Sequence, residues 1–436
     1  MAWSSCARAG ALLAILLGLA ASADALYTLQ GGSTQGALLR QSDNEKHLQA
    51  AVQDVEHVDC VAKFEAMNVS PFTFYRGSNQ LYYRDLADQK LITRSAFYDP
   101  HANPWIQGDM HVLNAGRFDN DKGIVVYDLN DFDEAFVANY LYDVYRLASS
   151  IILVARNNSM HDDEAVSCVE TFAVAYREQL KKLAKDEAEP LSLDAKSSRG
   201  LKMLSKWTRV NRKGQREFDT ESEDLEAVSE EEWRDISDAM GDYVKKTVTS
   251  PLRGDTEYFA VQDIARRRNA GTGSLGTQRY YILIAGDSAK DSSDDRILDA
   301  KLQGRPSIYP YLTQQQQDAV YRAVANDADR AVRAYLSLIA RADDHLGYLK
   351  LSAGYFSVRE RSPYKKSLDL TSGVDKAVLD ELAEQYGIML ANAHARSDKG
   401  NEALGAPKSF EGLVEHDYAL FLDSLRTGQM CPAAAQ

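Results

Sequence analysis

The spacing of hydrophobic and polar positions changes along the chain, and these changes predict both strands and helices. Three short apolar runs bounded by polar turns are typical of strands: residues 280–286, 296–302 and 354–361. Apolar side chains recur at helical spacing in residues 314–342 and 378–397, and another helix is expected from about Asn139 through the run SIILVARNN. Strands clustered in one part of the sequence and long helices elsewhere indicate an α+β fold.

The N-terminus has the pattern of a secretory signal peptide. A short segment with one arginine, MAWSSCARAG, precedes the apolar run ALLAILLGLA, and ASADA offers small-residue cleavage sites after Ala23 or Ala25. We therefore expect residues 1–25 to be a signal peptide and the protein to be periplasmic or extracellular. The alternative is an uncleaved anchor. Residues 26–59 are polar and are expected to be peripheral.

Composition excludes several classes of protein. The 436 residues carry a net charge of −14, which disfavours a general nucleic-acid binder because phosphates would not be neutralised. No later apolar run is long enough to span a bilayer. Cleavage would leave three cysteines, too few for a disulfide framework, and without a CxxC motif a structural zinc site has no support.

Residues 181–234 are dense in charges of both signs, as in KMLSKWTRVNRKGQREF followed by TESEDLEAVSEEEW. Such a segment is most simply interpreted as a solvated or mobile insertion. A basic face for an anionic substrate is the alternative interpretation.

Carboxylates gather at the end of an apolar strand in VVYDLNDFDEA, residues 125–135. Asp128, Asp131, Asp133 and Glu134 would repel one another unless a cation neutralised them. Oxygen ligands of this kind suit Mg²⁺ or Mn²⁺. We take Asp131 as the first candidate ligand, with Asp128 and Asp133 as further candidates; the alternative is an acidic surface turn.

A second polar motif, WIQGDMHVLNAG, precedes this cluster and supplies complementary groups. The carboxylate of Asp109 can orient a substrate hydroxyl and accept its proton. The amide oxygen of Asn114, five positions later, can reach the same metal. Phosphoryl-transfer sites divide their work in this way between an aspartate, an asparagine and a metal-binding aspartate.

A glycine-rich stretch, NAGTGSLGTQRYYILIAG, lies far downstream. Gly271, Gly273 and Gly276, with Ser274 among them, precede a strand, as in loops that cover nucleotide phosphates. Lys301 falls on the next predicted strand, where it could hold the phosphates. Taken singly, the glycines could form a plain hairpin and Lys301 could be a surface lysine.

The chain resembles a family of unknown function, numbered 2252, that is related to protein kinases and aminoglycoside phosphotransferases. The similar segments run from about Val61 to the C-terminus: SPFTFYRG, GDMHVLNAG, YDLNDFDEA, YDVYRLASS, DIARRRNAGTGSLGT, DDHLGYL, YFSVRER and LANAHARS. The resemblance implies that Asp109 is the catalytic base and that Asn114 and Asp131 bind metal. It also implies supporting roles for His111 and Asp143, the latter on the helix that braces the catalytic loop.

In kinases the glycine-rich loop precedes the catalytic loop, but here it follows. The resemblance therefore implies a two-lobed, kinase-like fold in circularly permuted order. Residues 60–235 would form the catalytic helical lobe and residues 256–361 the strand lobe. Residues 362–436 would form C-terminal helices that return to the first lobe.

These features favour an ATP- and Mg²⁺-dependent phosphotransferase that acts on an unidentified hydroxyl-bearing acceptor. A nucleotide-binding pseudokinase or partner-binding module is the main alternative, because no glutamate can be assigned as the partner of Lys301. Nucleotidyl transfer in the same cleft is another alternative. A metal-dependent hydrolase using Asp109, His111, Asp131 and Asp133 would explain the carboxylates but not the glycine-rich stretch.

Overall fold

The computed structural model describes residues 57–119, 125–184, 204, 206–212, 215–249, 252–268, 276–287, 294–362, 368–370 and 372–400. The predicted signal peptide, most of the peripheral segment, and Gly271, Gly273 and Ser274 lie outside these residues. Across the described ranges, no helix has the length and apolar character needed to cross a membrane.

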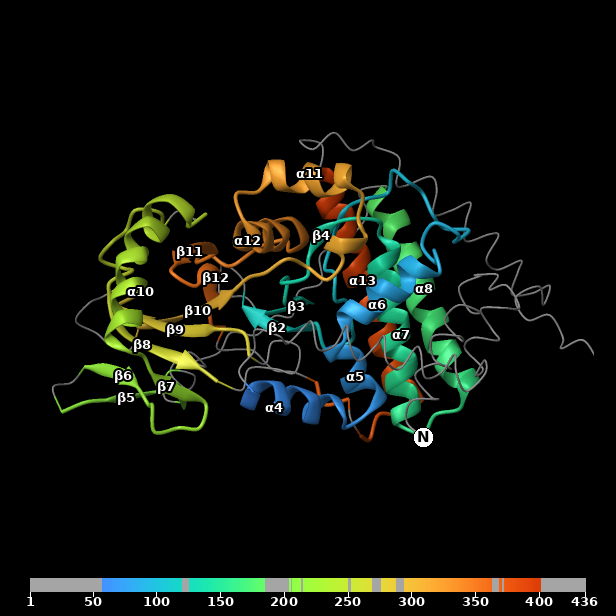
Figure 1. The fold of residues 1–436 in the computed structure, drawn as a ribbon. Coiled ribbons are helices and arrows are strands. Elements are labelled where there is room, and N and C mark those ends of the chain that lie inside the picture. The colour runs from blue at the N-terminus through green and yellow to red at the C-terminus, as the bar shows by residue number, and fades with distance from the viewer. Residues whose placement is uncertain are drawn as a thin grey trace, which may run out of the picture.

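A six-stranded antiparallel sheet forms one end of the molecule (Figure 1), in the order β11-β12-β10-β9-β8-β7. Its strands are β7 (Leu225–Ala227), β8 (Val261–Arg267), β9 (Arg279–Ile284), β10 (Arg296–Leu302), β11 (Gly347–Leu351) and β12 (Gly354–Glu360). The three strands predicted from apolar runs are confirmed as β9, β10 and β12. β8 and β9 are neighbours, so the glycine-rich stretch connects adjacent antiparallel strands.

The two faces of this sheet are buried by different partners. Leu298 and Ala300 of β10 join an apolar cluster with α10 (Glu230–Asp242) and the π-helical turn η1 (Tyr243–Thr247). Because side chains alternate along a strand, Asp299 and Lys301 point to the opposite face. That face turns toward the rest of the molecule and bears the polar groups described below.

Helices make up most of the other end of the molecule (Figure 1). They are α4 (His57–Met67), α5 (Pro71–Gly77), α6 (Asn79–Asp88), α7 (Leu141–Asn157), α8 (Asp162–Ala184) and α13 (Lys376–Gly400). α13 packs closely along α8: a Cβ atom at Gly387 would lie 2.5 Å from the backbone oxygen of Phe172. The close approach of the two backbones therefore requires glycine there.

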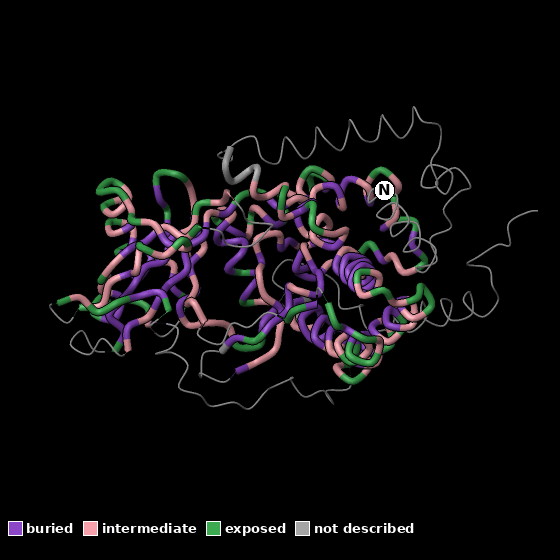
Figure 2. The backbone as a smooth tube through the Cα atoms, turned by 90° about the horizontal axis from the view of Figure 1, so that it is seen from below, coloured by how far each residue is buried: buried purple, intermediate pink, exposed green. Residues whose placement is uncertain are grey.

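Short strands and two further helices join the two ends. These are β1 (Trp105–Ile106), β2 (Ala115–Asp119), β3 (Val125–Leu129), β4 (Phe136–Val137), the 3₁₀ turn η2 (Tyr309–Tyr311), α11 (Gln314–Ala323) and α12 (Asp327–Leu338). They share one large buried cluster with α7, α8 and α13. Figure 2 shows that buried residues occur in both the sheet end and the helical end of the molecule.

The structure of residues 314–342 differs from the expectation in two respects. The helix predicted over residues 314–342 is two helices, because the side chain of Asn326 caps α12 by accepting a hydrogen bond from the backbone N–H of Asp329 (2.9 Å). The helices α11 and α12 also join the large core cluster, although they fall within the predicted strand lobe.

The charged segment 181–234 is not a solvated insertion throughout. It contains β5 (Thr208–Val210), β6 (Arg216–Phe218) and β7, and β7 is the edge strand of the six-stranded sheet. Trp207, Phe218 and Leu225 are buried against the sheet. A few apolar side chains among many charges are enough to pack this segment on the sheet. The sheet therefore starts at β7, earlier in the sequence than predicted.

Candidate functional site

One carboxylate, that of Asp143 on α7, holds the start of the loop from Gln107 to Asn114. Asp143 is 1% exposed and accepts hydrogen bonds from the backbone N–H groups of Gln107 (2.6 Å) and Gly108 (2.9 Å). Gly108 has a φ of 82°, and a Cβ atom there would lie 2.0 Å from the backbone oxygen of Glu134. The loop therefore packs directly against the acidic turn that follows β3, and only glycine fits at the contact.

Gln107 connects this loop to the acidic turn. Its side-chain oxygen accepts a hydrogen bond from the backbone N–H of Asp109 (2.8 Å). Its amide nitrogen donates to the backbone oxygens of Asn130 (3.2 Å) and Asp131. One buried amide thus fixes the spacing between the two polar motifs.

Asp109 lies beside a fully buried arginine. The Nε atom of Arg146 donates to its carboxylate (2.5 Å), and the amide nitrogen of Asn114 donates to its backbone oxygen (2.8 Å). Burial raises the pKa of the Asp109 carboxyl to about 7, and the charge of Arg146 opposes that rise. Asp109 can therefore hold or release a proton near neutral pH.

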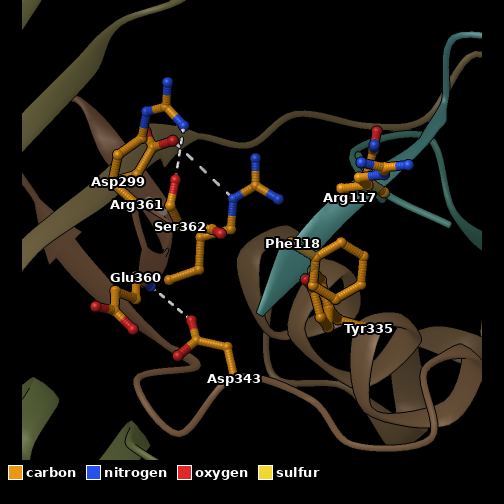
Figure 3. Close-up of a pocket in the computed structure, with 10 residues that line it drawn as sticks. Arg117, Phe118, Asp299, Tyr335, Asp343, Glu360, Arg361 and Ser362 are labelled. Carbon is orange, nitrogen blue, oxygen red and sulfur yellow. Dashed lines mark hydrogen bonds and ion pairs between the residues drawn. The ribbon is translucent and has the colours of Figure 1, made fainter. Parts of the chain in front are cut away.

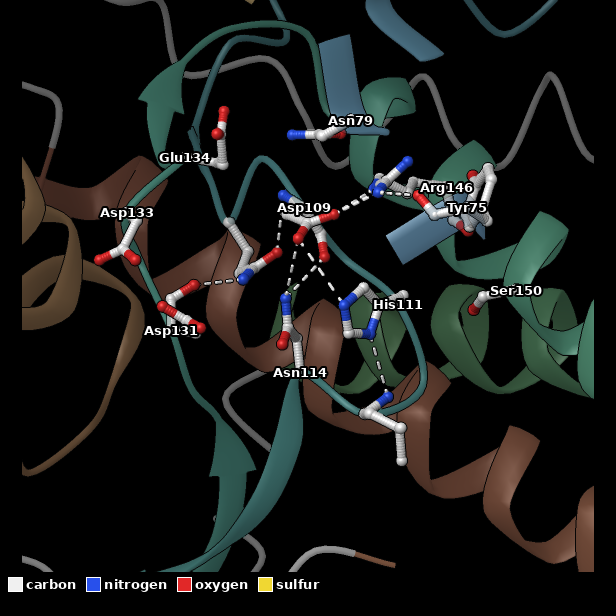
Figure 4. Close-up of polar contacts among 12 residues, drawn as sticks. Tyr75, Asn79, Asp109, His111, Asn114, Asp131, Asp133, Glu134, Arg146 and Ser150 are labelled. Atoms are coloured by element: carbon white, nitrogen blue, oxygen red, sulfur yellow. Dashed lines mark hydrogen bonds and ion pairs between the residues drawn. The ribbon is translucent and has the colours of Figure 1, made fainter. Parts of the chain in front are cut away.

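His111 lies beside Asp109 in the same loop (Figure 4). Its Nδ1 atom accepts a hydrogen bond from the backbone N–H of Leu113 (3.2 Å), and its Nε2 atom lies 3.7 Å from the Asp109 carboxylate. Burial and the charges of Arg76 and Arg146 hold its pKa well below the ordinary value, so the ring is neutral. His111 therefore shapes the loop and carries no charge near Asp109.

The acidic turn meets the sheet at Lys301. The ammonium group contacts the carboxylate of Asp133 and lies 3.6 Å from that of Asp131. Gln303 donates a second hydrogen bond to Asp133 (2.6 Å). The predicted lysine is therefore next to two of the predicted metal ligands, Asp131 and Asp133.

The acidic turn has a left-handed residue at its centre. Asp131 has a φ of 62°, a conformation that aspartate adopts more readily than most residues. Its backbone oxygen accepts from Gln107, while its side chain faces Lys301 and is 45% exposed. Figure 4 shows Asp131 and Asp133 on one side of Asn114 and His111 on the other. The Asp131 carboxylate is therefore accessible to solvent beside Lys301.

Arg330 on α12 holds the rear of the turn. Its guanidinium is fully buried and donates to the backbone oxygens of Asp133 (2.7 Å), Ala135 and Gly304 (3.0 Å). The Glu134 carboxylate in turn accepts from the backbone N–H of Ser307 (2.6 Å). Glu134 therefore ties the turn to the segment after β10, and its carboxylate is engaged away from Asp131.

The C-terminal helix α13 packs against the loop although it is distant in sequence. Tyr386 donates to the backbone oxygen of Val112 (2.8 Å), and His394 lies with its Nε2 atom 3.3 Å from Asp143. Tyr176 of α8 fixes the other ring nitrogen of His394 (2.8 Å). His394 is thus a fully buried residue that connects α8 to Asp143.

Two groups of side chains are candidates for a metal. The first is the set predicted from the sequence: the Asp131 and Asp133 carboxylates both lie at Lys301, and the Asn114 amide nitrogen donates to the backbone oxygen of Asp109. The second comprises Asp343, His345 and Glu360, whose ligand atoms lie within 4.8 Å of one another. Hard oxygen ligands suit Mg²⁺ in the first group, and the mixed nitrogen and oxygen set of the second suits a transition metal.

Asp128 is not part of the first group. It lies on β3, its carboxylate accepts from the backbone N–H of Leu129 (2.8 Å), and the cation that acts on it is Arg396 of α13. Burial raises the pKa of Asp128 to about 6. We therefore set Asp128 aside as a metal ligand.

Several residues that build this site were missed in the sequence: Gln107, Arg146, Gln303 and Arg330. The hydrophobic pattern does not distinguish a buried arginine from a surface arginine, because both count as polar positions. The tight spacing of Gln107 before Asp109 is the one signal that could have identified a member of this set.

The sequence matches the family described as "Uncharacterized protein conserved in bacteria (DUF2252)" over residues 58–420. No curated protein and no solved structure matches the chain.

Proposed function

The chain belongs to the DUF2252 family, whose description names no activity, and we propose from the geometry of the site that it is an ATP- and Mg²⁺-dependent phosphotransferase with a hydroxyl-bearing acceptor. The family relation to kinase-like folds and the permuted order belong to the same proposal. A fold of this kind would bring the β8–β9 connection, Lys301, Asp131 and Asp109 around one cleft.

The contact of Lys301 with Asp131 and Asp133 carries the proposal. An isolated lysine on a strand would turn to solvent, yet this one is 9% exposed and lies among carboxylates from a distant part of the chain. A lysine and two carboxylates beside a loop with Asp109 and Asn114 provide both charges that phosphoryl transfer needs. Cations hold the phosphates, and a carboxylate accepts the proton.

Each residue has a distinct part in this mechanism. Bound Mg²⁺ would neutralise charge on the phosphates, with Asp131, Asp133 and the Asn114 amide oxygen as its protein ligands. Lys301 would exchange its carboxylate partners for phosphate oxygens. Asp109 would orient the acceptor hydroxyl and receive its proton. The new bond joins the acceptor oxygen to the γ-phosphorus, the bond from the γ-phosphorus to the bridging oxygen breaks, and ADP leaves.

One observation favours nucleotide binding without transfer. Arg146 is fully buried and ion-paired with Asp109, which reduces the basicity of the carboxylate that should accept the proton. The opposing effect is burial, which dominates and raises the pKa of Asp109 to about 7. A carboxylate with that pKa remains competent as a base at neutral pH, so we favour the enzyme.

The test is the transfer of phosphate from ATP. Purified protein is incubated with ATP and Mg²⁺, ADP release is measured, and mass spectrometry searches for a phosphate added to the protein or to pooled hydroxyl compounds. The proposal requires Mg²⁺-dependent ADP release that is lost in Asp131→Asn. ATP binding without any ADP release would instead establish the pseudokinase alternative.

A further inference from the structure

A pocket lies between the sheet and the β2–β3 hairpin, next to the candidate site. It is lined from the sheet side by Asp299, Arg359, Glu360 and Arg361, and from the opposite side by Arg117 and Phe118 of β2 (Figure 3). Tyr335, Asp343, Asn130 and Ser362 complete the lining. Three arginines and three acidic residues thus border one small pocket. The net charge of the pocket depends on which of them are ion-paired with other residues.

Two acids that line the pocket are neutralised by groups that do not line it. Asp299 accepts two hydrogen bonds from Arg279, one of them at 2.6 Å. This pairing outweighs burial and holds the pKa of Asp299 well below its usual range. Glu360 lies 3.5 Å from the guanidinium of Arg296.

Asp343 is hydrogen-bonded to His345 and to the backbone of Glu360. Its carboxylate accepts from the ring Nδ1 atom (2.9 Å) and from the backbone N–H of Glu360 (2.5 Å). These bonds engage both oxygens of the Asp343 carboxylate with groups outside the pocket lining or with backbone.

The arginines that line the pocket are far less compensated. The closest approach of Arg359 to Asp299 is 4.0 Å, at the limit of an ion pair. Arg361 donates to the hydroxyl of Tyr281 (3.1 Å), a neutral group. Arg117 is exposed, and within the described ranges no carboxylate lies at ion-pair distance from Arg117 or Arg361. Arg117 and Arg361 therefore border the pocket without an ion-paired carboxylate among the described residues.

We infer that this pocket is a binding site for an oxyanion group, a phosphate or a carboxylate, on a small molecule. Guanidinium groups from two sides match the planar and tetrahedral arrays of acceptor oxygens in such groups. Asn130 and Ser362 add neutral hydrogen-bonding side chains, and Phe118 and Tyr335 add apolar surface for the body of the molecule.

The pocket adjoins the candidate phosphotransfer site. Asn130 immediately precedes Asp131, and Asp299 lies two positions before Lys301 on the same face of β10. Burial lowers the pKa of Arg359, and the charge of Asp299 is the largest effect that raises it. The charge of Asp131 raises this pKa further. An oxyanion in this pocket would therefore lie close to the metal-binding carboxylates without using Asp109.

Calorimetric titration of the full chain with inorganic phosphate, pyrophosphate and citrate tests the inference without nucleotide. We expect binding of at least one anion, weakened about tenfold by Arg117→Gln and by Arg361→Gln, since each removes one charge-assisted hydrogen bond. The control is Arg234→Gln, an exposed arginine of α10 that is 73% exposed and distant in sequence from the pocket. Thermal unfolding verifies that each variant is folded.

The anion that binds identifies the source of the oxyanion group. Preference for phosphate or pyrophosphate assigns a phosphorylated ligand, and preference for citrate assigns a carboxylate. Competition with Mg²⁺–ATP would place the phosphates of the nucleotide itself in the pocket, whereas simultaneous binding would place a second molecule there.

Absence of anion binding in the wild type, or equal binding in Arg117→Gln, Arg361→Gln and the control, overturns the inference. The proposed phosphotransferase would survive that outcome, because its own test measures ADP release. Conversely, anion binding by a protein that never turns over ATP would retain the pocket and reject the enzyme.

Discussion

The ammonium group of Lys301 on β10 lies 3.6 Å from the carboxylate of Asp131, although the two residues are far apart in the sequence. Lys301 also contacts Asp133, so this one ammonium group joins β10 to the acidic turn, which is distant in sequence.

If phosphates replace these carboxylates as partners of Lys301, Lys301→Met should weaken ATP binding about 10- to 100-fold. Calorimetry measures the affinity. Lys350→Met, on the exposed side of β11 in the same sheet, is the control and should bind ATP as the wild type does.

Asp131→Asn should weaken Mg²⁺ and ATP together, because one negative ligand is lost while the side-chain size is kept. A drop of at least about tenfold in Mg²⁺ affinity is expected. The matched control is Asp128→Asn on β3, whose carboxylate interacts with the backbone of Leu129 and with Arg396. If Asp128→Asn lost Mg²⁺ and Asp131→Asn did not, the assignment of ligands would be reversed.

Asp109→Asn should lower turnover without lowering ATP affinity. General-base catalysis is worth about 10²–10⁴-fold in rate, and the change removes the proton acceptor while keeping its shape. ADP release and ATP binding are measured on the same preparation. Equal turnover of variant and wild type would show that Asp109 is not the base.

The pH dependence of turnover independently tests whether the Asp109 carboxylate is the proton acceptor. Burial raises the pKa of its carboxyl from the ordinary 3.8 to about 7. Below that pKa the carboxyl is protonated and cannot accept a proton, so the rate should rise as pH increases through about 7 and level off above it. In Asp109→Asn this rise should vanish. A wild-type rate that is flat from pH 6 to about 8 contradicts the role of Asp109 as the base.

Gly108→Ala should destabilise the protein and disrupt the site. The left-handed φ of 82° alone costs an alanine about 1–2 kcal/mol. The new methyl group would also meet the backbone of Glu134. Gly241→Ala, in α10 with open space around it, should instead stabilise by about 0.5–1 kcal/mol. Denaturant unfolding measures both changes, and equal effects in the two variants would refute the close packing of loop and turn.

The pattern of apolar positions predicted β9, β10 and β12 well because polar turns bound each of these short runs. RILDAKL matches β10 from its first to its last residue, even with Asp299 and Lys301 inside it. β8, with the sequence VQDIARR, was not recognised, because its outward polar residues outnumber its buried ones. Trp207 and Phe218 were hidden in the same way among the charges of the segment 181–234.

The motifs indicated which residues carry chemistry but not what surrounds them. Asp131, Asp133 and Lys301 could be proposed as partners of one site from their motifs and from the family resemblance. The arginine beside Asp109 could not, since Arg146 lies within a helix whose pattern gives it no distinct position. Long-range contacts of single polar side chains depend on the complete fold, which local sequence does not encode.

The titration of the wild-type protein with ATP, in the presence of Mg²⁺ and then of a chelator, tests the central claim most directly. Our account predicts binding with Mg²⁺ that is strongly weakened by the chelator, since the Asp131 and Asp133 carboxylates and the phosphates would otherwise repel each other. ATP affinity that is absent in both conditions, or equal in both, would contradict a Mg²⁺-dependent nucleotide site at Asp131 and Lys301.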